Sequence, residues 1–240
     1  MKALQYLAAA ALLAACSAPG GAPPTDSAPS PVQGGKQYTL LDLPNLDDNV
    51  HNDTLLVYTT HDAGNGLFVM AARNVDETRD GLRLYLYRPK ADSSAEVLAC
   101  SKPAFDSSVM LPTFFSTGDT ADGLVILANY GERESWGQNA FWLKDGRFKD
   151  LGWLDVTRRE WKDREDSLQQ WRVGIAPYTQ VNGHDGQFTF TFNTDSVQLY
   201  DDLEGHTEVM LPAARISYRY NGKDLVLVVD GQERHPRQPL

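Results

Sequence analysis

The chain has 240 residues, of which 22 are basic and 32 acidic, so its formal charge at pH 7 is −10. Nucleic acids and anionic lipid headgroups are bound by concentrated positive surfaces, and this charge balance argues against both as partners. Apolar residues make up 42% and aromatic residues 10% of the chain, which is enough for a folded core rather than a disordered stalk.

The first 15 residues have the pattern of a secretory signal peptide. Lys2 is their only charged residue, and the segment 4–13 is built almost entirely of Leu and Ala. An apolar segment of about ten residues is too short to span a bilayer. The segment closes on Leu13-Ala14-Ala15-Cys16, which resembles the lipobox of bacterial lipoproteins.

This resemblance implies that the signal 1–15 is removed and that Cys16 becomes the first mature residue and carries acyl chains. In proteobacterial lipoproteins, Ser rather than Asp after the lipidated Cys favours the outer membrane, and Ser17 follows Cys16 here. In some lipoprotein groups an acidic cluster after the lipidated Cys marks export to the cell surface. Asp26 is the only acidic residue before Lys36, so the resemblance implies that this chain faces the periplasm. Each buried acyl methylene contributes about 0.8 kcal/mol, which would hold an acidic protein at a membrane.

Residues 16–36 are predicted to form a lipidated tether, because five prolines and four glycines lie between 17 and 36 without any apolar period. The remaining residues 37–240 are predicted to form a single domain. After lipidation of Cys16, Cys100 would be the only free thiol, so no intramolecular disulfide is expected. We expect Cys100 to be a small buried hydrophobic residue of a strand, as free cysteines usually are.

Apolar residues alternate with period two along most of this domain, which is typical of half-buried strands. Two hairpins are predicted at Asp145-Gly146 and Asn221-Gly222, because type I′ turns need the positive φ that these dipeptides accept. The sequence therefore predicts a mostly β, antiparallel hairpin meander that forms a sandwich or an irregular propeller-like domain. Strands are predicted at 55–60, 67–72, 82–86, 109–117, 124–128 and 188–192, and the alternation is clearest at 82–86 and 188–192.

One segment, at about 157–171, is predicted to be a surface helix. Its first four residues have the capping-box form, beginning with Thr157 and ending with Glu160. Trp161, Leu168 and Trp171 would share one side of such a helix, and the mixed charges between 158 and 166 would face solvent.

The candidate metal-binding residues are clusters of acidic side chains and histidines. Asp47, Asp48, His51 and Asp53 form the densest group of oxygen ligands, and calcium is the cation that such a loop would bind. The run lacks the spacing of an EF-hand loop, so a polar turn is the alternative interpretation. The pairs at 61–62 and 184–185 repeat a His-Asp pattern without a second histidine at zinc-site spacing, and we expect both pairs in hairpin loops.

A loop tryptophan supplies the remaining candidate site. Trp136, with Glu134 and Asn139 beside it, combines an aromatic face with polar groups, as sugar-binding and protein-binding sites do. The alternative is that Trp136 folds over the end of the core. No nucleophile motif and no cofactor motif occurs in the sequence, so we expect a non-enzymatic binding or assembly domain for a glycan or a protein partner. An envelope hydrolase acting on polysaccharide or peptidoglycan is the alternative function.

Overall fold

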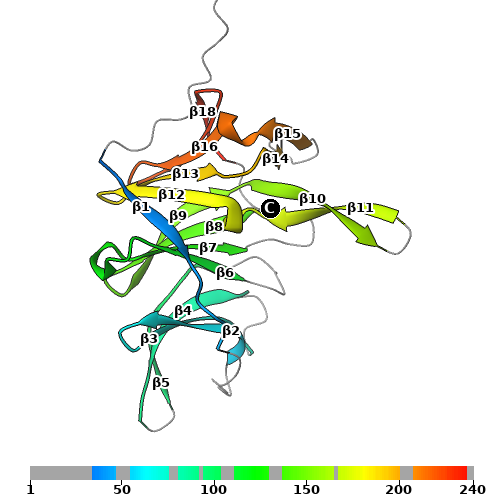
Figure 1. Ribbon diagram of the computed structural model, residues 1–240. Coiled ribbons are helices and arrows are strands. Elements are labelled where there is room, and N and C mark those ends of the chain that lie inside the picture. The colour runs from blue at the N-terminus through cyan, green and yellow to red at the C-terminus, as the bar shows by residue number, and fades with distance from the viewer. Residues whose placement is uncertain are drawn as a thin grey trace, which may run out of the picture.

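The computed structural model describes residues 34–46, 55–75, 81–91, 94–103, 111–129, 137–164, 167–200 and 208–236. In these residues the chain forms antiparallel strands arranged in three sheets, with three single-turn 3-10 helices (Figure 1). The prediction of a mostly β, antiparallel domain is confirmed. Cys16 and the predicted tether up to residue 33 lie outside the described residues.

The largest sheet has ten strands in the order β18-β17-β16-β13-β12-β1-β6-β7-β8-β9. The first strand of the domain lies in its middle: Lys36–Tyr38 pair with β12, and Thr39–Leu41 pair with β6. The strands are β1 (Lys36–Leu41), β6 (Pro112–Ser116), β7 (Leu124–Asn129), β8 (Gln138–Lys144), β9 (Arg147–Leu154), β12 (Thr179–His184), β13 (Gln187–Phe192), β16 (Ile216–Tyr220), β17 (Leu225–Val229) and β18 (Gln232–Arg234).

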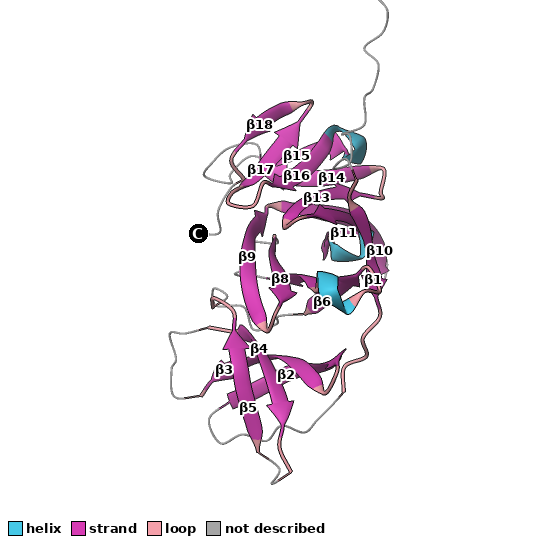
Figure 2. Ribbon diagram, turned by 90° about the vertical axis from the view of Figure 1, so that its left-hand side faces the viewer, coloured by secondary structure: helices cyan, strands magenta, loops and turns pink. Residues whose placement is uncertain are grey.

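This sheet curls so that its last strand, β9, returns toward β16 and β17 (Figure 2). Gly152 of β9 lies so close to β17 that a Cβ there would meet the side chain of Leu225 at 2.9 Å. The concave side encloses one apolar core to which strands from both halves contribute. Its most deeply buried large members include Phe115, Phe188, Phe190 and Tyr218.

A second sheet, in the order β2-β3-β4-β5, packs below the first one in Figure 1. Its strands are β2 (Leu55–Gly64), β3 (Leu67–Asn74), β4 (Arg83–Pro89) and β5 (Ala95–Cys100). Val69 and Leu84 from this sheet share a second core with Phe114, Phe141 and Trp153 from the ten-stranded sheet. The β6–β9 part of the large sheet is therefore buried on both faces.

The third sheet has the order β11-β10-β14-β15, with β10 (Val156–Arg164), β11 (Ser167–Gly174), β14 (Ser196–Tyr200) and β15 (Glu208–Pro212). The predicted helix at 157–171 is wrong, because β10 and β11 form a hairpin there. The Thr157 hydroxyl does not cap a helix but donates to the Val173 carbonyl across the hairpin at 2.6 Å.

The two predicted tight turns join strands as expected. Asp145 and Gly146 have φ of 50° and 70°, and they link β8 to β9. The turn after β16 is longer than a two-residue turn: the Asn221 amide donates to the Asp224 carbonyl at 3.1 Å, and only Gly222 has positive φ. The 3-10 turns are η1 (Thr120–Asp122), η2 (Ala176–Tyr178) and η3 (Ala213–Arg215). None of the described helices has the length and apolar character that crossing a bilayer requires.

Cys100 ends β5 and is exposed, so the prediction of a buried thiol is wrong. The reason is that β5 is the last strand of its sheet, and Val97 and Leu98 are also exposed. A strand at the edge of a sheet has no neighbour on one side, and here even apolar residues remain accessible.

Candidate functional site

The most distinctive surface feature is the β10–β11 hairpin, which projects away from the rest of the molecule (Figure 1). Eight residue pairs join its strands, from Thr157–Gly174 at the base to Arg164–Ser167. Only Val156 and Thr157 of β10 pair with β14, the next strand of the sheet. Beyond Thr157 the hairpin therefore extends as a two-stranded ribbon.

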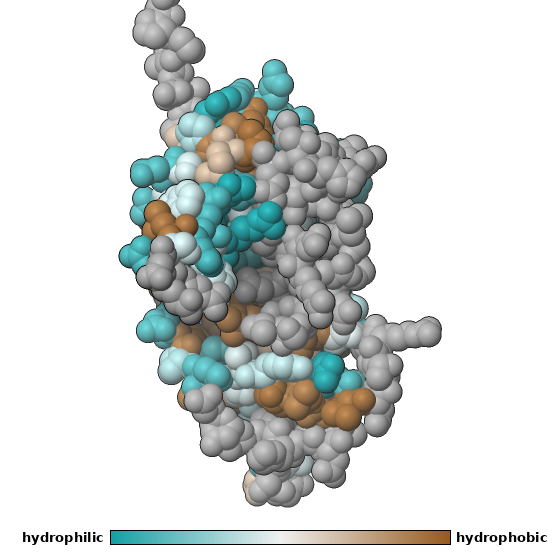
Figure 3. Space-filling view, turned by 90° about the vertical axis from the view of Figure 1, so that its right-hand side faces the viewer, coloured by the Kyte–Doolittle hydropathy of each residue, from teal (hydrophilic) through white to brown (hydrophobic). Residues whose placement is uncertain are grey.

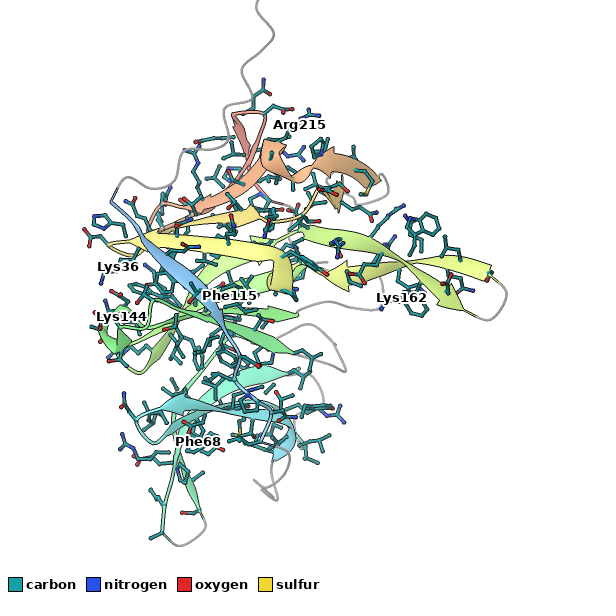
Figure 4. All side chains as sticks on the ribbon, viewed as in Figure 1. Lys36, Phe68, Phe115, Lys144, Lys162 and Arg215 are labelled. Atoms are coloured by element: carbon teal, nitrogen blue, oxygen red, sulfur yellow. The ribbon has the colours of Figure 1, made fainter. Side chains whose placement is uncertain are left out.

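Each face of this ribbon carries a tryptophan, and side chains stand off both sides in Figure 4. Residues directly opposite one another in an antiparallel pair share a face. Trp161 is opposite Gln170 and Asp163 is opposite Leu168, so Trp161 and Leu168 lie diagonally on one face. They are 61% and 59% exposed.

Trp171 lies on the other face of the ribbon, opposite Glu160, and is 41% exposed. The Lys162 ammonium lies 6.0 Å from the centre of its ring, at the outer limit of a cation–π contact. Burying a tryptophan contributes several kcal/mol through apolar area, so two such side chains left in solvent forgo a large stabilisation. Trp161, Leu168 and Trp171 together make the hairpin the strongest candidate for a contact surface.

Side-chain hydrogen bonds hold the base of the hairpin to the body. The Tyr178 hydroxyl donates to Glu160 at 2.9 Å, and Glu160 also forms an ion pair with Arg158 at 2.6 Å. Arg159 donates across the hairpin to Gln170 at 2.7 Å and also donates to Gln198 of β14. These bonds fix the direction of the ribbon at its root, while strand pairing from Trp161–Gln170 to Arg164–Ser167 continues along its outer part.

The hairpin differs in charge from the rest of the chain. Its two strands contain five basic and two acidic residues, whereas the whole chain has a net charge of −10. Glu165 and Asp166, between the strands, lie outside the described residues. Figure 3 faces the side from which the ribbon projects, and it shows apolar patches separated by hydrophilic surface.

Of the predicted ligand-binding set, only Asn139 lies in the described residues. It is fully buried at the start of β8, and its amide donates to the Asp150 carboxylate at 2.8 Å. Asp150 also accepts from the Gly152 amide at 3.0 Å and pairs with Lys102 at 2.6 Å. Asn139 thus orients Asp150. Its predicted contact with a ligand stays a prediction, because Glu134 and Trp136 lie outside the described residues.

The predicted calcium ligands Asp47, Asp48, His51 and Asp53 also lie outside the described residues, so that prediction is untested. Among the described residues, no three His, Cys, Asp or Glu side chains lie close enough together to hold a metal ion.

The two His-Asp pairs differ in structure. His61 lies in β2 rather than in a loop, which corrects that expectation; it is 7% exposed and its Nδ1 is 2.9 Å from the Leu43 carbonyl. Its ring lies 5.0 Å from that of Phe114, and its Nε2 is buried without a hydrogen-bond partner. His184 ends β12 and lies 3.3 Å from Asp185, at an exposed turn as predicted.

A small cavity of about 260 Å³ lies between β9, the start of β17 and the residues that follow β18. Asp150, Lys223, Asp224 and His235 supply its polar lining. Small-molecule sites usually occupy about 300–1,000 Å³ and are mostly apolar. This cavity is smaller and more polar, and the Asp150 carboxylate is already held by Lys102 and Asn139.

Titratable groups with perturbed pKa values belong to the body of the protein and serve its structure. Burial, with the Asp155 carboxylate beside it, raises the pKa of Tyr218 well above its usual value, and its hydroxyl donates to that carboxylate. Burial also raises the pKa of Tyr38 to about 12. Hydrogen bonds from Thr117 and Lys36 lower the pKa of Asp122, and the bond from Lys36 joins η1 to the first strand.

Searches against protein-family models, curated proteins and solved structures each gave no match. The candidate site therefore rests on the geometry of the hairpin. Sequence reasoning named Trp161, Leu168 and Trp171 but placed them on a helix whose charged side faced solvent. No local signal in the sequence separates the two structures, because Val156 and Thr157 at the base are buried but residues 158–163 are not, so no hydrophobic alternation marks the strand.

Proposed function

We propose that this chain is a lipid-anchored protein of the bacterial cell envelope that binds a protein partner through the β10–β11 hairpin and has an assembly rather than a catalytic role. The proposal combines the lipobox-like motif ending at Cys16 with the structure of the domain behind it. Acyl chains on Cys16 would be its contact with the membrane, at the periplasmic face of the outer membrane.

The observation that carries this proposal is the exposure of Trp161, Leu168 and Trp171 on a ribbon that projects from the body. Tryptophan and arginine dominate the energetics of protein interfaces, and both occur along the hairpin. A protein partner is favoured over a glycan because the aromatic rings lie on opposite faces of a ribbon. A sugar ring is usually held in a concave site, with polar groups around one aromatic face.

The test is a pair of variants expressed as full-length, lipidated protein. Trp161→Ala with Trp171→Ala should leave folding and membrane fractionation unchanged but abolish hairpin-dependent complexes seen on native gels of detergent-extracted membranes. Val97→Ala with Leu98→Ala is the matched control, because both residues are exposed apolar side chains of an edge strand elsewhere. If complexes persist in the tryptophan variant, or if the control variant loses them to the same extent, the hairpin is not the contact.

The anchor is tested separately through Cys16→Ser. This variant should accumulate as an unprocessed or mislocalised precursor, and normal membrane fractionation would contradict the lipidation of Cys16.

A further inference from the structure

The three sheets end in six edge strands, and five of these carry a feature that hinders pairing with another chain. Edge strands expose unpaired backbone groups, and proteins usually protect them by shortness, proline, bulges or cover. Strand β18 has three residues, and β15 has five and ends in Pro212. Register shifts interrupt the pairing of β2, β5 and β9 with their neighbours, and β9 also packs against β17.

The sixth edge strand, β11, has none of these features. Its eight residues pair with β10 in one uninterrupted register, and it contains no proline. Ser167 to Arg172 are exposed, and only Val173 and Gly174 at the base are partly covered. A long, regular and exposed edge is suited to the addition of one more strand, with main-chain hydrogen bonds giving affinity and side chains giving specificity.

We propose that this strand is supplied by β11 of a second copy of the chain, paired antiparallel about Gln170. The inference rests on the hairpin being the docking surface proposed above, and it names the partner. A twofold axis perpendicular to the ribbon leaves each face of the hairpin on the same side of the joined sheet in both copies. Two residues that pair across the new contact must therefore come from the same face of β11. Centring the register on Gln170 satisfies this condition and overlaps all residues from Ser167 to Val173.

The side chains of β11 are self-complementary in that register. Gln170 of one copy lies opposite Gln170 of the other, and their side-chain amides can exchange hydrogen bonds. Leu168 meets Arg172, and Gln169 meets Trp171, each twice by symmetry. Like charges directly opposite one another destabilise an antiparallel pair, and this register contains none. The joined ribbons also bring Trp161 and Leu168 of each copy onto one continuous face.

The acidic bodies do not prevent this pairing, because the ribbon keeps them apart. In an antiparallel pair the two bases lie at opposite ends of the shared strands. Eight residues at about 3.4 Å each separate the bases by about 27 Å. The Debye length at physiological ionic strength is about 8 Å, so repulsion across that distance is largely screened. Confinement of both copies to one membrane would raise their effective concentration further.

Position 168 gives a test with matched charges. Leu168→Lys places a cation opposite Arg172 at both symmetry-related pairs, whereas Leu168→Glu places an anion there. Because Leu168 is 59% exposed, neither change should unfold the body of the protein. Within the hairpin, position 168 lies opposite Asp163, which attracts the lysine and repels the glutamate. Weaker dimerisation of the lysine variant therefore cannot come from damage to its own hairpin. We expect the purified full-length chain in detergent to dimerise, the lysine variant to dissociate about tenfold more readily, and the glutamate variant to dimerise more tightly than the lysine variant. Sedimentation equilibrium gives the three dissociation constants.

A second measurement separates this inference from the function on which it rests. A photo-crosslinking amino acid at position 169 is irradiated in intact cells, and the mass of each adduct is read on a denaturing gel. An adduct of twice the chain mass, together with the charge dependence at position 168, supports the second copy. A monomeric purified chain that crosslinks only to a protein of another mass overturns the second copy and leaves the docking function standing.

Two further results would be equally decisive. A monomeric chain without any adduct at position 169 overturns both the second copy and the docking hairpin. A dimer that neither charge variant changes also overturns the inference, because its interface must then lie elsewhere. The same crosslinker at Val97, on the exposed edge strand β5, is the control for random collision.

Discussion

The ten-stranded sheet and the β10–β11 hairpin use tryptophan in opposite ways. In the body, Trp153 is only 3% exposed, and Trp142 donates its indole N–H to the Asp122 carbonyl at 2.8 Å while its ring packs against Phe188. On the hairpin, Trp161 and Trp171 are 61% and 41% exposed. Body and hairpin are both antiparallel strands, so secondary structure does not account for the difference.

The difference lies in what covers each strand. The curled sheet encloses a core on its concave face and shares a second core with the sheet β2–β5 on the other. Among the described residues, no second sheet packs on either face of the hairpin beyond Thr157. Isolated two-stranded hairpins are only marginally stable in water. The body therefore holds the folding energy, whereas the apolar area of the hairpin is available for contact with another molecule.

The largest expected effect is on the body, through Phe190→Ala. Phe190 is fully buried in the core of the curled sheet, and truncating such a side chain usually costs about 3–5 kcal/mol of unfolding free energy. Trp161→Ala removes a larger side chain but should change the unfolding free energy by no more than about 0.5 kcal/mol. Urea denaturation of both variants measures this contrast, and similar losses would show that the two regions do not differ as described.

A smaller effect is expected for Tyr218→Phe. The hydroxyl of Tyr218 donates to the buried Asp155 carboxylate, so its removal should cost about 1–3 kcal/mol at neutral pH. The pKa of Tyr218 is raised in the folded state, so its contribution to stability is complete below pH 10 and is lost as the pH rises beyond that value. Thermal unfolding should therefore show a shallower alkaline decline in the variant. Parallel curves for the two proteins would contradict this assignment.

Sequence reasoning recovered the body well, because strands that border a core alternate between buried and accessible residues. Phe188, Phe190 and Phe192 lie in the core of the curled sheet, as their spacing indicated. The helix predicted at 157–171 is wrong because only Thr157, among the described residues of this range, is buried, so alternation carries no hydrophobic signal. The intervals between Trp161, Leu168 and Trp171 are seven and three residues, which also fit a helix, and no glycine marks the turn between the strands.

The two other errors have related causes. Cys100 was expected inside because free cysteines usually are, but its strand lies at the edge of a sheet, and pairing order between distant strands is not visible in local sequence. Asn139 was grouped with Trp136 because they are close in sequence. The bulge between β8 and β9 instead places its amide on Asp150, a contact that depends on the register of the pair.

A still smaller effect is expected where the first strand is attached to the body. Lys36 donates to Asp122 at 2.9 Å, and the pKa of Asp122 is lowered by the hydrogen bonds from Thr117 and Lys36. Its contribution to stability is therefore present above pH 4 and is lost as the pH falls through the lowered pKa. Asp122→Asn should lower the thermal midpoint at pH 7, and this decrease should become smaller as the pH falls below 4. An equal decrease at pH 7 and below pH 4 would show that the loss is steric rather than ionic.

The smallest change in stability should come from Trp161→Phe combined with Trp171→Phe, and this variant tests the comparison between body and hairpin most directly. Trp161 and Trp171 are 61% and 41% exposed, and phenylalanine keeps an aromatic ring at both positions, so the unfolding free energy should stay within about 0.5 kcal/mol of the native value. Acrylamide should quench the native protein more than the variant at low protein concentration, because Trp153 is shielded in both. If hairpins pair, raising the concentration should protect the native fluorescence and reduce this difference. Equal quenching at low concentration would mean that the hairpin rings are already covered within one chain, and the hairpin would then be part of the folded body.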